Sequence, residues 1–383
     1  MKKNKEFKIL FNKPLKVNKF LINLNDKYLS NKTSGRGFYT SKIENFLEKL
    51  YKTRNSKVLL TTSCTHALEA SAILLNLKKS DEIIVPSYTF VSTALSFFMH
   101  GAKIRFCDVG LDLNINPALI EKLINKNTKA IVVVHYGGFA CDMSSIMKIA
   151  KKYKLYVIED NAHGLFGKYK GKELGTFGDL STLSFHETKN IACGEGGALV
   201  INNKNFYKRA KLIIEKGTNR IDFHNGNVNK YSWIDKGSSY VMSEILAANL
   251  YNNIKSFKRI QRKRSIIWNF YFYELAKWAK QNNVKIPNLD KQSLHSNHLF
   301  YLIFPSKKKS KHFILHMKQK KIQVSTHYLP LNKSKFYKRS YKKNITLKNS
   351  ENFSERLVRL PLYYNLDLTQ QKQIINEINK YDV

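Results

Sequence analysis

The stretch AIVVVHYGGFACDMSSIMKIAKKYKLYVIEDN, residues 130–161 of the 383-residue chain, decides the fold. It begins and ends with apolar runs, Ala130–Tyr136 and Leu155–Asn161, and the helical pattern MSSIMKIAKKYK lies between them. Near-continuous apolar strands joined by a helix are typical of a parallel sheet that helices cover on both faces. The stretch therefore predicts one strand–helix–strand unit of such a sheet.

The same pattern extends on both sides of this unit through the first 250 residues. Apolar runs that we expect to form further strands are Lys57–Ser63, Glu82–Ser87, Lys103–Val109, Ser181–His186 and Gly197–Asn202. Helical patterns such as THALEASAILLNL separate these runs. Alternating strands and helices predict the α/β fold class, with a parallel sheet.

After about residue 240 the pattern changes. We expect one long helix from about residue 243 towards Lys280, strands within 298–304 and 323–331, a basic helix between those strands, and a terminal helix from about Leu368. This order of elements indicates a smaller α+β domain. We therefore expect a large α/β domain at residues 1–250 and a small C-terminal domain at residues 251–383.

Composition bounds the function. No apolar run reaches the roughly 18 residues of a membrane span, and the basic N-terminus lacks the apolar core of a signal peptide. We therefore expect a cytoplasmic protein without a membrane partner. The four cysteines form no CxxC pair, so we expect reduced thiols.

The net charge of +38 raises the question of a polyanionic partner. Eleven Arg among 66 basic residues leave 55 Lys, and the lysines are spread over the whole length. Nucleic-acid sites favour clustered charge and the bidentate contacts of Arg. We expect solvated basic faces and no nucleic-acid partner, and a polyanion-binding protein is the alternative from another functional class.

Two polar clusters follow predicted strands, where ligands bind in open α/β sheets. In TTSCTHALEA (Thr61–Ala70), Ser63, Cys64 and Thr65 would open a helix, and a helix N-terminus suits a phosphate. An ordinary helix cap is the alternative. In PSYTFVSTA (86–94), Tyr88 and Phe90 could stack on a flat ring, or they could be core or surface aromatics.

Two further clusters are more specific. VIEDNAHG (157–164) closes an apolar strand with Glu159 and Asp160, and His163 follows. Buried carboxylates are costly unless they pair with a metal, a cation or a protonated ring nitrogen, whereas solvated strand-end charges need no partner. SFHETKN (Ser184–Asn190) then places Lys189 just before GEGG.

Together these clusters call for one cofactor with a phosphate, a flat ring, a basic ring nitrogen and a carbonyl that condenses with a lysine. Pyridoxal 5'-phosphate (PLP) has all four features, and its usual protein partners are a Schiff-base lysine and an acid at the ring nitrogen. We therefore expect PLP as cofactor, Lys189 as the lysine, and no metal.

The order of S-C-T, P-S-Y-T-F, E-D-x-A-H, S-F-H-E-T-K-N and G-E-G-G resembles the DegT/DnrJ/EryC1/StrS family of nucleotide-sugar aminotransferases. The resemblance implies a fold-type I PLP enzyme with a mostly parallel seven-stranded sheet, working as a homodimer with shared sites. It implies that Asp160 pairs with the ring nitrogen and that Lys189 forms the Schiff base. The other implied cofactor contacts are His163 beside the ring, Phe90 stacked on it, and Cys64, Thr65 and Ser184 at the phosphate.

EKGTNR (215–220), NKYSWIDKGSSYVMSE (229–244) and SFHETKN resemble one subgroup of this family. That subgroup implies transfer of the amino group of L-glutamate to dTDP-4-oxo-6-deoxy-D-glucose, giving dTDP-4-amino-4,6-dideoxy-D-galactose. The gluco epimer, or a 3-aminotransferase acting on a related dTDP or UDP oxo-sugar, is the alternative. A family dehydratase is disfavoured, since those enzymes have histidine in place of the lysine.

Three residues are candidate substrate contacts, namely Arg36, Arg220 and Tyr328. The chain also departs from the family in one place. Many relatives have Tyr-Asn before the helix near MSEILAANL, and that Asn reaches the phosphate bound to the partner subunit. Here Val241 follows Tyr240, so we expect the contact to be absent or to pass to Ser238 or Ser239.

Overall fold

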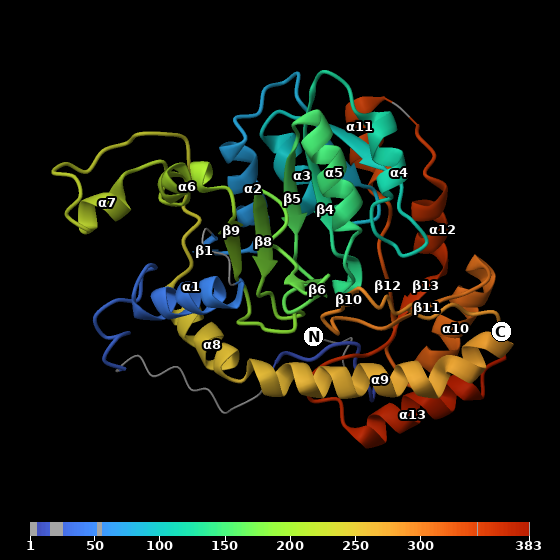
Figure 1. Ribbon diagram of the computed structural model, residues 1–383. Coiled ribbons are helices and arrows are strands. Elements are labelled where there is room, and N and C mark those ends of the chain that lie inside the picture. The colour runs from blue at the N-terminus through green and yellow to red at the C-terminus, as the bar shows by residue number, and fades with distance from the viewer. Residues whose placement is uncertain (1–5, 16–25, 52–55, 343, 383) are drawn as a thin grey trace.

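A computed structural model describes residues 6–15, 26–51, 56–342 and 344–382 of the chain (Figure 1). At its centre is a seven-stranded sheet in the order β1-β9-β8-β5-β4-β2-β3, in which β9 runs antiparallel to both neighbours. Its strands are β1 (Lys57–Thr61), β2 (Glu82–Pro86), β3 (Lys103–Cys107), β4 (Thr128–Val134), β5 (Tyr156–Asp160), β8 (Leu180–Ser184) and β9 (Gly197–Ile201). The predictions of an α/β fold and of a mostly parallel seven-stranded sheet are confirmed.

Helices cover both faces of this sheet (Figure 1). One face carries α2 (Cys64–Leu74), α3 (Ser92–Met99) and α6 (Tyr207–Ile214), and the other carries α1 (Phe38–Tyr51), α4 (Pro117–Ile120), α5 (Met143–Tyr153) and α8 (Glu244–Lys255). Successive side chains of a strand point to opposite faces. On β4, Val132 packs on the α2 side and Val133 on the α5 side, which explains the unbroken apolar run in the sequence.

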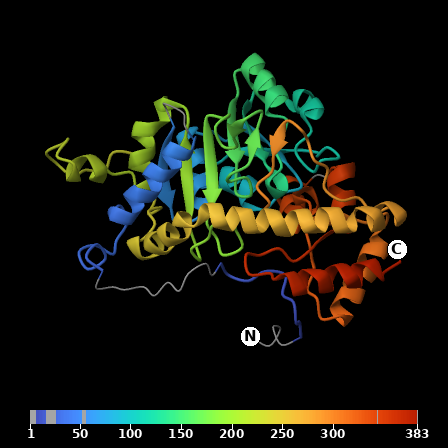
Figure 2. The same ribbon diagram turned by 60° about the horizontal axis from the view of Figure 1, so that its bottom comes forward.

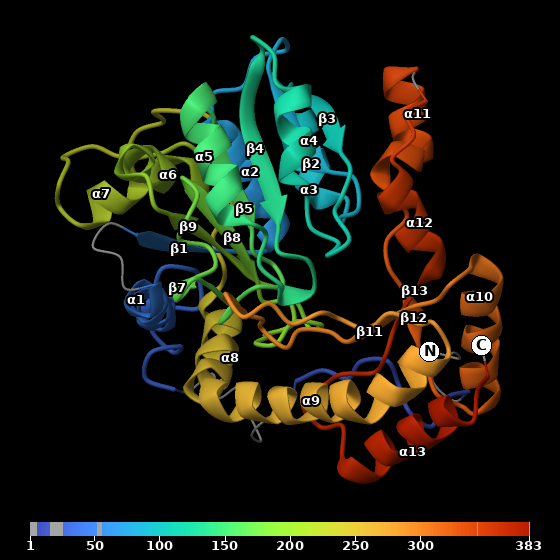
Figure 3. The same ribbon diagram turned by 45° about the vertical axis from the view of Figure 1, so that its right-hand side comes forward.

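The C-terminal part is built on the long helix α9 (Phe257–Gln281), which extends from α8 past the central sheet to a second, antiparallel sheet (Figures 2 and 3). That sheet has the order β11-β13-β12. Its elements and neighbours are β11 (Tyr301–Ile303), β12 (Ser325–Thr326), β13 (Leu357–Arg359), α10 (Lys307–Gln319) and α13 (Leu368–Asn379). The strands expected within 298–304 and 323–331, the basic helix between them and the terminal helix are therefore present.

The prediction of one long helix from about residue 243 to Lys280 is wrong. Helix α8 ends at Lys255, α9 begins at Phe257, and Ser256 between them has φ −96° and ψ 10°. Serine favours helix ends because its hydroxyl competes for nearby backbone groups. The break lets α9 leave the direction of α8 (Figure 3).

Several short elements were not predicted. They are α7 (Arg220–His224), α11 (Lys335–Tyr341), α12 (Lys348–Arg356), β6 (Lys168–Tyr169), β7 (Lys172–Glu173) and β10 (Ser293–Leu294). Segment α11–α12 returns to the central sheet, where the N–H groups of Asn349 and Ser350 donate to the Asp108 carboxylate at 2.9 and 2.8 Å. The C-terminal segment therefore contacts both sheets.

The expected division at residue 250 falls inside α8, and it stays a prediction. Within the described ranges, no helix is both long enough and apolar enough to cross a membrane.

Candidate active site

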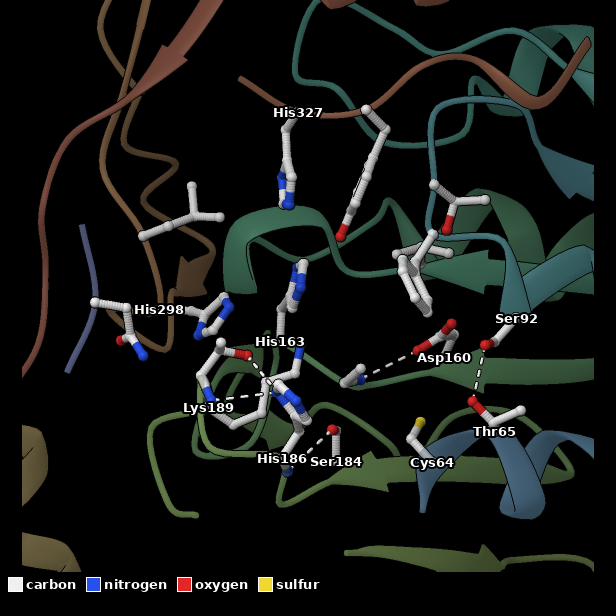
Figure 4. Close-up of a pocket in the computed structure, with 18 of the residues that line it drawn as sticks. Cys64, Thr65, Ser92, Asp160, His163, Ser184, His186, Lys189, His298 and His327 are labelled. Carbon is white, nitrogen blue, oxygen red and sulfur yellow. Dashed lines mark hydrogen bonds between the residues drawn. The ribbon is translucent and has the colours of Figure 1, made fainter. Parts of the chain in front are cut away.

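A cavity of about 540 Å³ opens at the carboxyl ends of the parallel strands (Figure 4). Eight predicted site residues line it, and they come from sequence positions as far apart as 64 and 328. They are Cys64, Thr65, Phe90, Asp160, His163, Ser184, Lys189 and Tyr328. The cavity therefore brings together every residue for which the family resemblance implies a cofactor contact. Tyr88, the other aromatic considered for stacking, is buried outside the lining, and its hydroxyl donates to the His327 carbonyl.

One wall of the cavity is the N-terminus of α2. Ser63 caps the helix by accepting a hydrogen bond from the His66 N–H at 3.1 Å, so the N–H groups of Cys64 and Thr65 have no partner within the helix. Gly197 of β9 closes this turn from behind, because an added Cβ there would lie 2.4 Å from the Cys64 nitrogen. Free N–H groups and a helix dipole make this wall a cradle for a phosphate.

Glu159, one of the two carboxylates that end β5, is completely used by the protein. It is fully buried and lies 2.9 Å from the His135 Nε2 atom. It also accepts hydrogen bonds from the backbone N–H groups of Gly175, Phe177 and Gly178 at 2.7–2.8 Å. This carboxylate holds the loop before β8 and does not line the cavity.

Asp160, the next residue, points to the opposite face of the sheet and into the cavity (Figure 4). The Thr93 hydroxyl donates to its Oδ2 at 2.7 Å and the Ala162 N–H to its Oδ1 at 3.2 Å. Burial raises the pKa of Asp160, and these two hydrogen bonds oppose the rise only in part. A cationic partner in the cavity would make the ionised carboxylate favourable.

Lys189 lies in the loop between β8 and β9. The loop is closed at its base, where the Phe185 N–H donates to the Gly196 carbonyl at 2.7 Å and the Glu187 N–H to the Gly194 carbonyl at 2.8 Å. Burial lowers the pKa of Lys189 to about 8, against the opposing effect of Cys64 and Asp160. An appreciable fraction of the amine is therefore neutral near pH 7, and the neutral form is the nucleophile.

Three histidines, His163, His298 and His327, lie along the wall that faces the N-terminus of α2 (Figure 4). The His163 ring stacks on that of His298 at 4.3 Å and lies 6.1 Å from that of His327. Burial lowers the pKa of His163 well below its ordinary value, and its Nδ1 accepts from the Gly137 N–H at 3.2 Å. His163 is therefore neutral with its proton on Nε2, a polar but uncharged edge for a flat ring.

Sequence reasoning missed several residues at the cavity, four of which bear on its chemistry. They are Thr93, which holds Asp160, and His298, His327 and Arg359, which line the wall. Thr93 lies in PSYTFVSTA, and His298 and His327 lie in the strands expected within 298–304 and 323–331, but nothing in these stretches tied the three residues to the cavity.

Phe90 lines the mouth of the cavity with 57% of its surface exposed, and its ring lies 6.3 Å from that of Tyr328. Arg36 and Arg220 do not line this cavity. Arg36 lies 3.5 Å from Glu44, and Arg220 donates to His224 at 3.3 Å. Their substrate roles stay predictions.

The cavity fits PLP on the chemistry of its side chains. It offers an amine with a lowered pKa, a buried carboxylate that needs a cation, and a phosphate cradle behind which Gly197 leaves no room for a Cβ. PLP carries the matching aldehyde, ring nitrogen and phosphate.

Comparison with known proteins agrees with this chemistry. The DegT/DnrJ/EryC1/StrS aminotransferase family matches residues 17–379. The chain is 32% identical over 343 residues to the UDP-4-amino-4,6-dideoxy-N-acetyl-beta-L-altrosamine transaminase of Campylobacter jejuni, covering 86% of this chain and 87% of that protein. It is 30% identical over 355 residues to the GDP-perosamine synthase of Escherichia coli O157:H7, covering 91% of both.

Among solved structures, it is similar to Helicobacter pylori PseC, an aminotransferase of pseudoaminic acid biosynthesis. The TM-score is 0.85 at 26% identity, over 97% of this chain and 98% of that one. The chain belongs to the DegT/DnrJ/EryC1/StrS aminotransferase family and is a PLP-dependent sugar aminotransferase.

Proposed function

We propose that the enzyme transfers the amino group of L-glutamate to C4 of dTDP-4-oxo-6-deoxy-D-glucose, giving dTDP-4-amino-4,6-dideoxy-D-galactose and 2-oxoglutarate. The observation that carries transamination is the meeting of Lys189, Asp160 and the α2 phosphate cradle in one cavity. The sugar rests on the resemblance of residues 215–220 and 229–244 to the galacto-forming subgroup. Relatives named for UDP and GDP sugars make the nucleotide the first thing to test.

Each predicted cofactor contact in the cavity has a role in this proposal. PLP, when bound, supplies an aldehyde and a ring that accepts electrons. Asp160 keeps the ring nitrogen protonated, and Lys189 holds the aldehyde and then moves the proton at the reacting carbon. The remaining cofactor contacts are Phe90 and His163 on the ring and Cys64, Thr65 and Ser184 at the phosphate. Burial raises the pKa of Cys64, so its thiol stays protonated beside the phosphate.

The position of Lys189 also bears on stereochemistry. Its loop is closed at the base, so the amine approaches the planar sugar carbon from one side only. A single C4 epimer should therefore form. The purified enzyme with L-glutamate and a panel of dTDP-, UDP- and GDP-oxo-sugars tests this, with products read by mass and NMR.

The NMR coupling between H3 and H4 separates the outcomes. A small coupling marks the axial amine of the galacto product. A large coupling would identify the gluco epimer, and reaction with a 3-oxo sugar alone would establish the 3-amino alternative.

We also propose a homodimer whose subunits share active sites. The segment around α7 extends away from the body (Figure 1), and it carries exposed aromatic side chains, with Tyr231 53% and Trp233 81% exposed. Exposed apolar groups of this kind favour burial in an interface. Ser238 and Ser239 at the end of this segment are exposed and could replace the missing Asn. In this proposal Arg36, Arg220 and Tyr328 contact the sugar nucleotide.

Mixing two inactive variants tests the shared site. If Arg220 acts on the neighbouring subunit's cavity, Lys189→Ala and Arg220→Ala subunits should restore activity when they are dissociated and reassociated together. Random pairing of a two-fold dimer would make about a quarter of the sites intact. A mixture no more active than its parts, in a protein shown by light scattering to be a dimer, would place Arg220 outside the shared site.

A further inference from the structure

A second cavity, of about 710 Å³, lies where the large sheet meets the antiparallel sheet of the C-terminal part. Its walls come from the segment after β3, the start of α5, the β6–β7 hairpin, residues 285–293 and β11. In Figure 1 these elements meet below α5. Among the described residues, none lines both this cavity and the one that contains Lys189. The second cavity is therefore a separate site, for which the reaction has no evident use.

Tyr301 gives this cavity a polar group without a partner. Its side chain lines the cavity, only 5% of the residue is exposed, and its ring packs 6.2 Å from that of Tyr136 and 6.4 Å from that of Phe139. The hydroxyl forms no hydrogen bond with any part of the chain that the structure describes. Buried tyrosine hydroxyls ordinarily have a hydrogen-bond partner. The hydroxyl of Tyr301 therefore points to a polar group on a ligand.

Asp112 adds a carboxylate to the same cavity, and a tight turn presents it. The Gly110 N–H donates to the Asn114 carbonyl at 2.8 Å, and Leu113 has φ 70°, a conformation that leucine rarely adopts. Leu113 is thereby buried, while the neighbouring Asp112 is exposed to the cavity. The carboxylate accepts only the two long hydrogen bonds of Asn114, both at 3.3 Å. It therefore has unused acceptor capacity.

The charged groups around the cavity are not paired with one another. Two lysines line it, Lys170 and Lys285, together with the carboxylates of Asp112, Asp142 and Asp290. Lys170 donates to the Ser144 hydroxyl at 2.9 Å, but none of the five forms an ion pair within the described ranges. Unpaired charges of both signs in one cavity complement a ligand that carries both a cationic and an anionic group.

The remaining lining suits a hydroxylated ring. Phe139, Ile286 and Ile303 offer apolar surface, and the amides of Asn288 and Gln292 offer donors and acceptors. A sugar has the matching surface, because its ring carbons carry C–H groups and each hydroxyl both donates and accepts. Small-molecule sites generally combine apolar walls with a few converging polar groups in this way.

We propose that the second cavity binds the amino-sugar nucleotide that the enzyme produces. The ammonium group of the sugar donates to Asp112 and to the Tyr301 oxygen, and the diphosphate lies at Lys170 and Lys285. Charge-assisted hydrogen bonds of this kind are stronger than neutral ones. The amine follows from sugar transamination itself. The diphosphate rests on the proposed function, in which the sugar is carried by a nucleotide, but the identity of the base and the ring position of the amine do not matter.

Counting bound product tests the proposal. The product is purified from the enzyme's own reaction and dialysed to equilibrium against enzyme loaded with pyridoxamine phosphate, which does not react with an amine. Two molecules should bind per chain at product concentrations up to about 1 mM, the upper end of the range in which enzymes bind their small molecules. One molecule per chain in the wild type would overturn the second site.

Two substitutions assign the second molecule to this cavity. Asp112→Asn and Tyr301→Phe should each weaken it roughly 10- to 100-fold, the usual effect of a lost hydrogen bond to a charged group. The first molecule and the initial rate of transamination should not change. Asp382→Asn and Tyr273→Phe are the matched controls, since both residues are exposed and Tyr273 is 72% exposed. The active site is measured in the same titration, so a misfolded variant would lose both molecules. A well-folded pair of variants that keep the second molecule at wild-type affinity would contradict the assignment.

Ligand analogues test the chemistry and separate it from the proposed function. Product acetylated on its amine lacks the positive charge and should bind the second cavity at least about tenfold more weakly. An amine-free nucleotide sugar that binds there as tightly as the product would show that the amine is not recognised. If the oxo-sugar panel yields a UDP- or GDP-linked product, the proposed dTDP substrate is wrong. That product then serves as the probe, and the count of bound molecules still decides the second site.

Discussion

The two faces of the central sheet at the end of β5 carry adjacent carboxylates with different fates. On the α5 side, Glu159 is surrounded by donors from the protein itself, three backbone N–H groups and His135. On the α3 side, Asp160 has two donors and a raised pKa, and it lines a cavity. The protein itself therefore supplies the hydrogen-bond partners of Glu159, whereas Asp160 depends on a bound group for its remaining partner.

The contrast separates structural from chemical use of a buried charge. A carboxylate satisfied by the protein stabilises the fold and is costly to remove, whereas one left partly unsatisfied costs stability until a ligand joins it. Substitutions on the two faces should therefore affect different quantities, turnover on the cavity side and unfolding on the other.

Among substitutions on the cavity side of the sheet, Lys189→Ala should cause the largest loss of turnover. Turnover should fall by about 10⁴-fold, because the amine that holds the aldehyde and moves the proton is gone. Borohydride reduction of the PLP-loaded wild type should fix a pyridoxyl group on the Lys189 peptide, seen by mass spectrometry, and the variant should show none. Lys152→Ala, an exposed lysine, is the control. Full turnover in Lys189→Ala would sink the assignment.

Asp160→Asn should lower turnover by at least ~10²-fold, since the ring nitrogen loses the anion that keeps it protonated. PLP should still bind through the phosphate cradle. The cofactor-free variant should be no less stable than the wild type. Because the raised pKa of Asp160 means that the folded state disfavours the ionised form, its contribution to stability falls as pH rises above the ordinary aspartate value. Near-normal rates would place the partner of the ring nitrogen elsewhere.

Glu159→Gln should show the opposite behaviour. The amide NH₂ group would face a backbone donor, and the free energy of unfolding should drop by about 2–3 kcal/mol. Turnover per folded molecule should stay near wild type, because Glu159 does not line the cavity. Denaturant titration followed by tryptophan fluorescence measures the loss. Unchanged stability combined with lost turnover would reverse the two roles.

Thr93→Val tests how much a single hydrogen bond to Asp160 contributes to turnover. It removes the donor hydroxyl and leaves the Asp160 carboxylate in place. We expect turnover to fall about tenfold, the effect of one hydrogen bond to a charged group. Thr93→Ser should restore it. If the serine variant is equally impaired, the methyl group of Thr93 matters and the hydroxyl does not.

The smallest effect concerns pH. The rate at which cofactor-free enzyme captures PLP covalently should rise with pH around a midpoint of about 8, the pKa of Lys189. Asp160 raises that pKa, so Asp160→Asn should move the midpoint down, by less than a full unit. Absorbance stopped-flow across the pH range gives both midpoints. An unmoved midpoint would mean that Asp160 is neutral in the cofactor-free enzyme, and an upward move would contradict the assigned effect of Asp160 on Lys189.

The sequence predicted the large sheet well because each of its strands is an apolar run that ends in polar residues. The same strand ends, at Cys64, Asp160 and Ser184, predicted the cavity residues, since parallel strands end at one edge. The alternation of side chains along β5 also places Glu159 and Asp160 on opposite faces of the sheet. Glu159 shares its face with Val157, and Asp160 shares the other face with Ile158.

The C-terminal contacts were not predictable in this way. Arg359 reaches the cavity through pairing of β13 with β12, a register that joins residues 325 and 359 and depends on two short strands. Thr93 gave no signal because a threonine inside a helix is usually a plain packing residue. The break at Ser256 and the helices α11 and α12 were missed because local propensity is weak beside tertiary packing.

The closed base of the loop that carries Lys189 also determines how fast the Lys189 amine can move during a turnover. Hydrogen bonds from Phe185 to Gly196 and from Glu187 to Gly194 tie the loop to the β8–β9 pair, so its backbone is not free to swing. The Lys189 amine must therefore move from the cofactor's aldehyde carbon to the reacting carbon by rotation about the four carbon–carbon bonds of its side chain. Such rotations take picoseconds to nanoseconds when a side chain is exposed, which leaves a wide margin for a packed side chain below the milliseconds to seconds of a typical turnover. The motion of the lysine therefore adds no slow step, and the pace of catalysis is left to proton transfer and to the arrival and departure of large substrates.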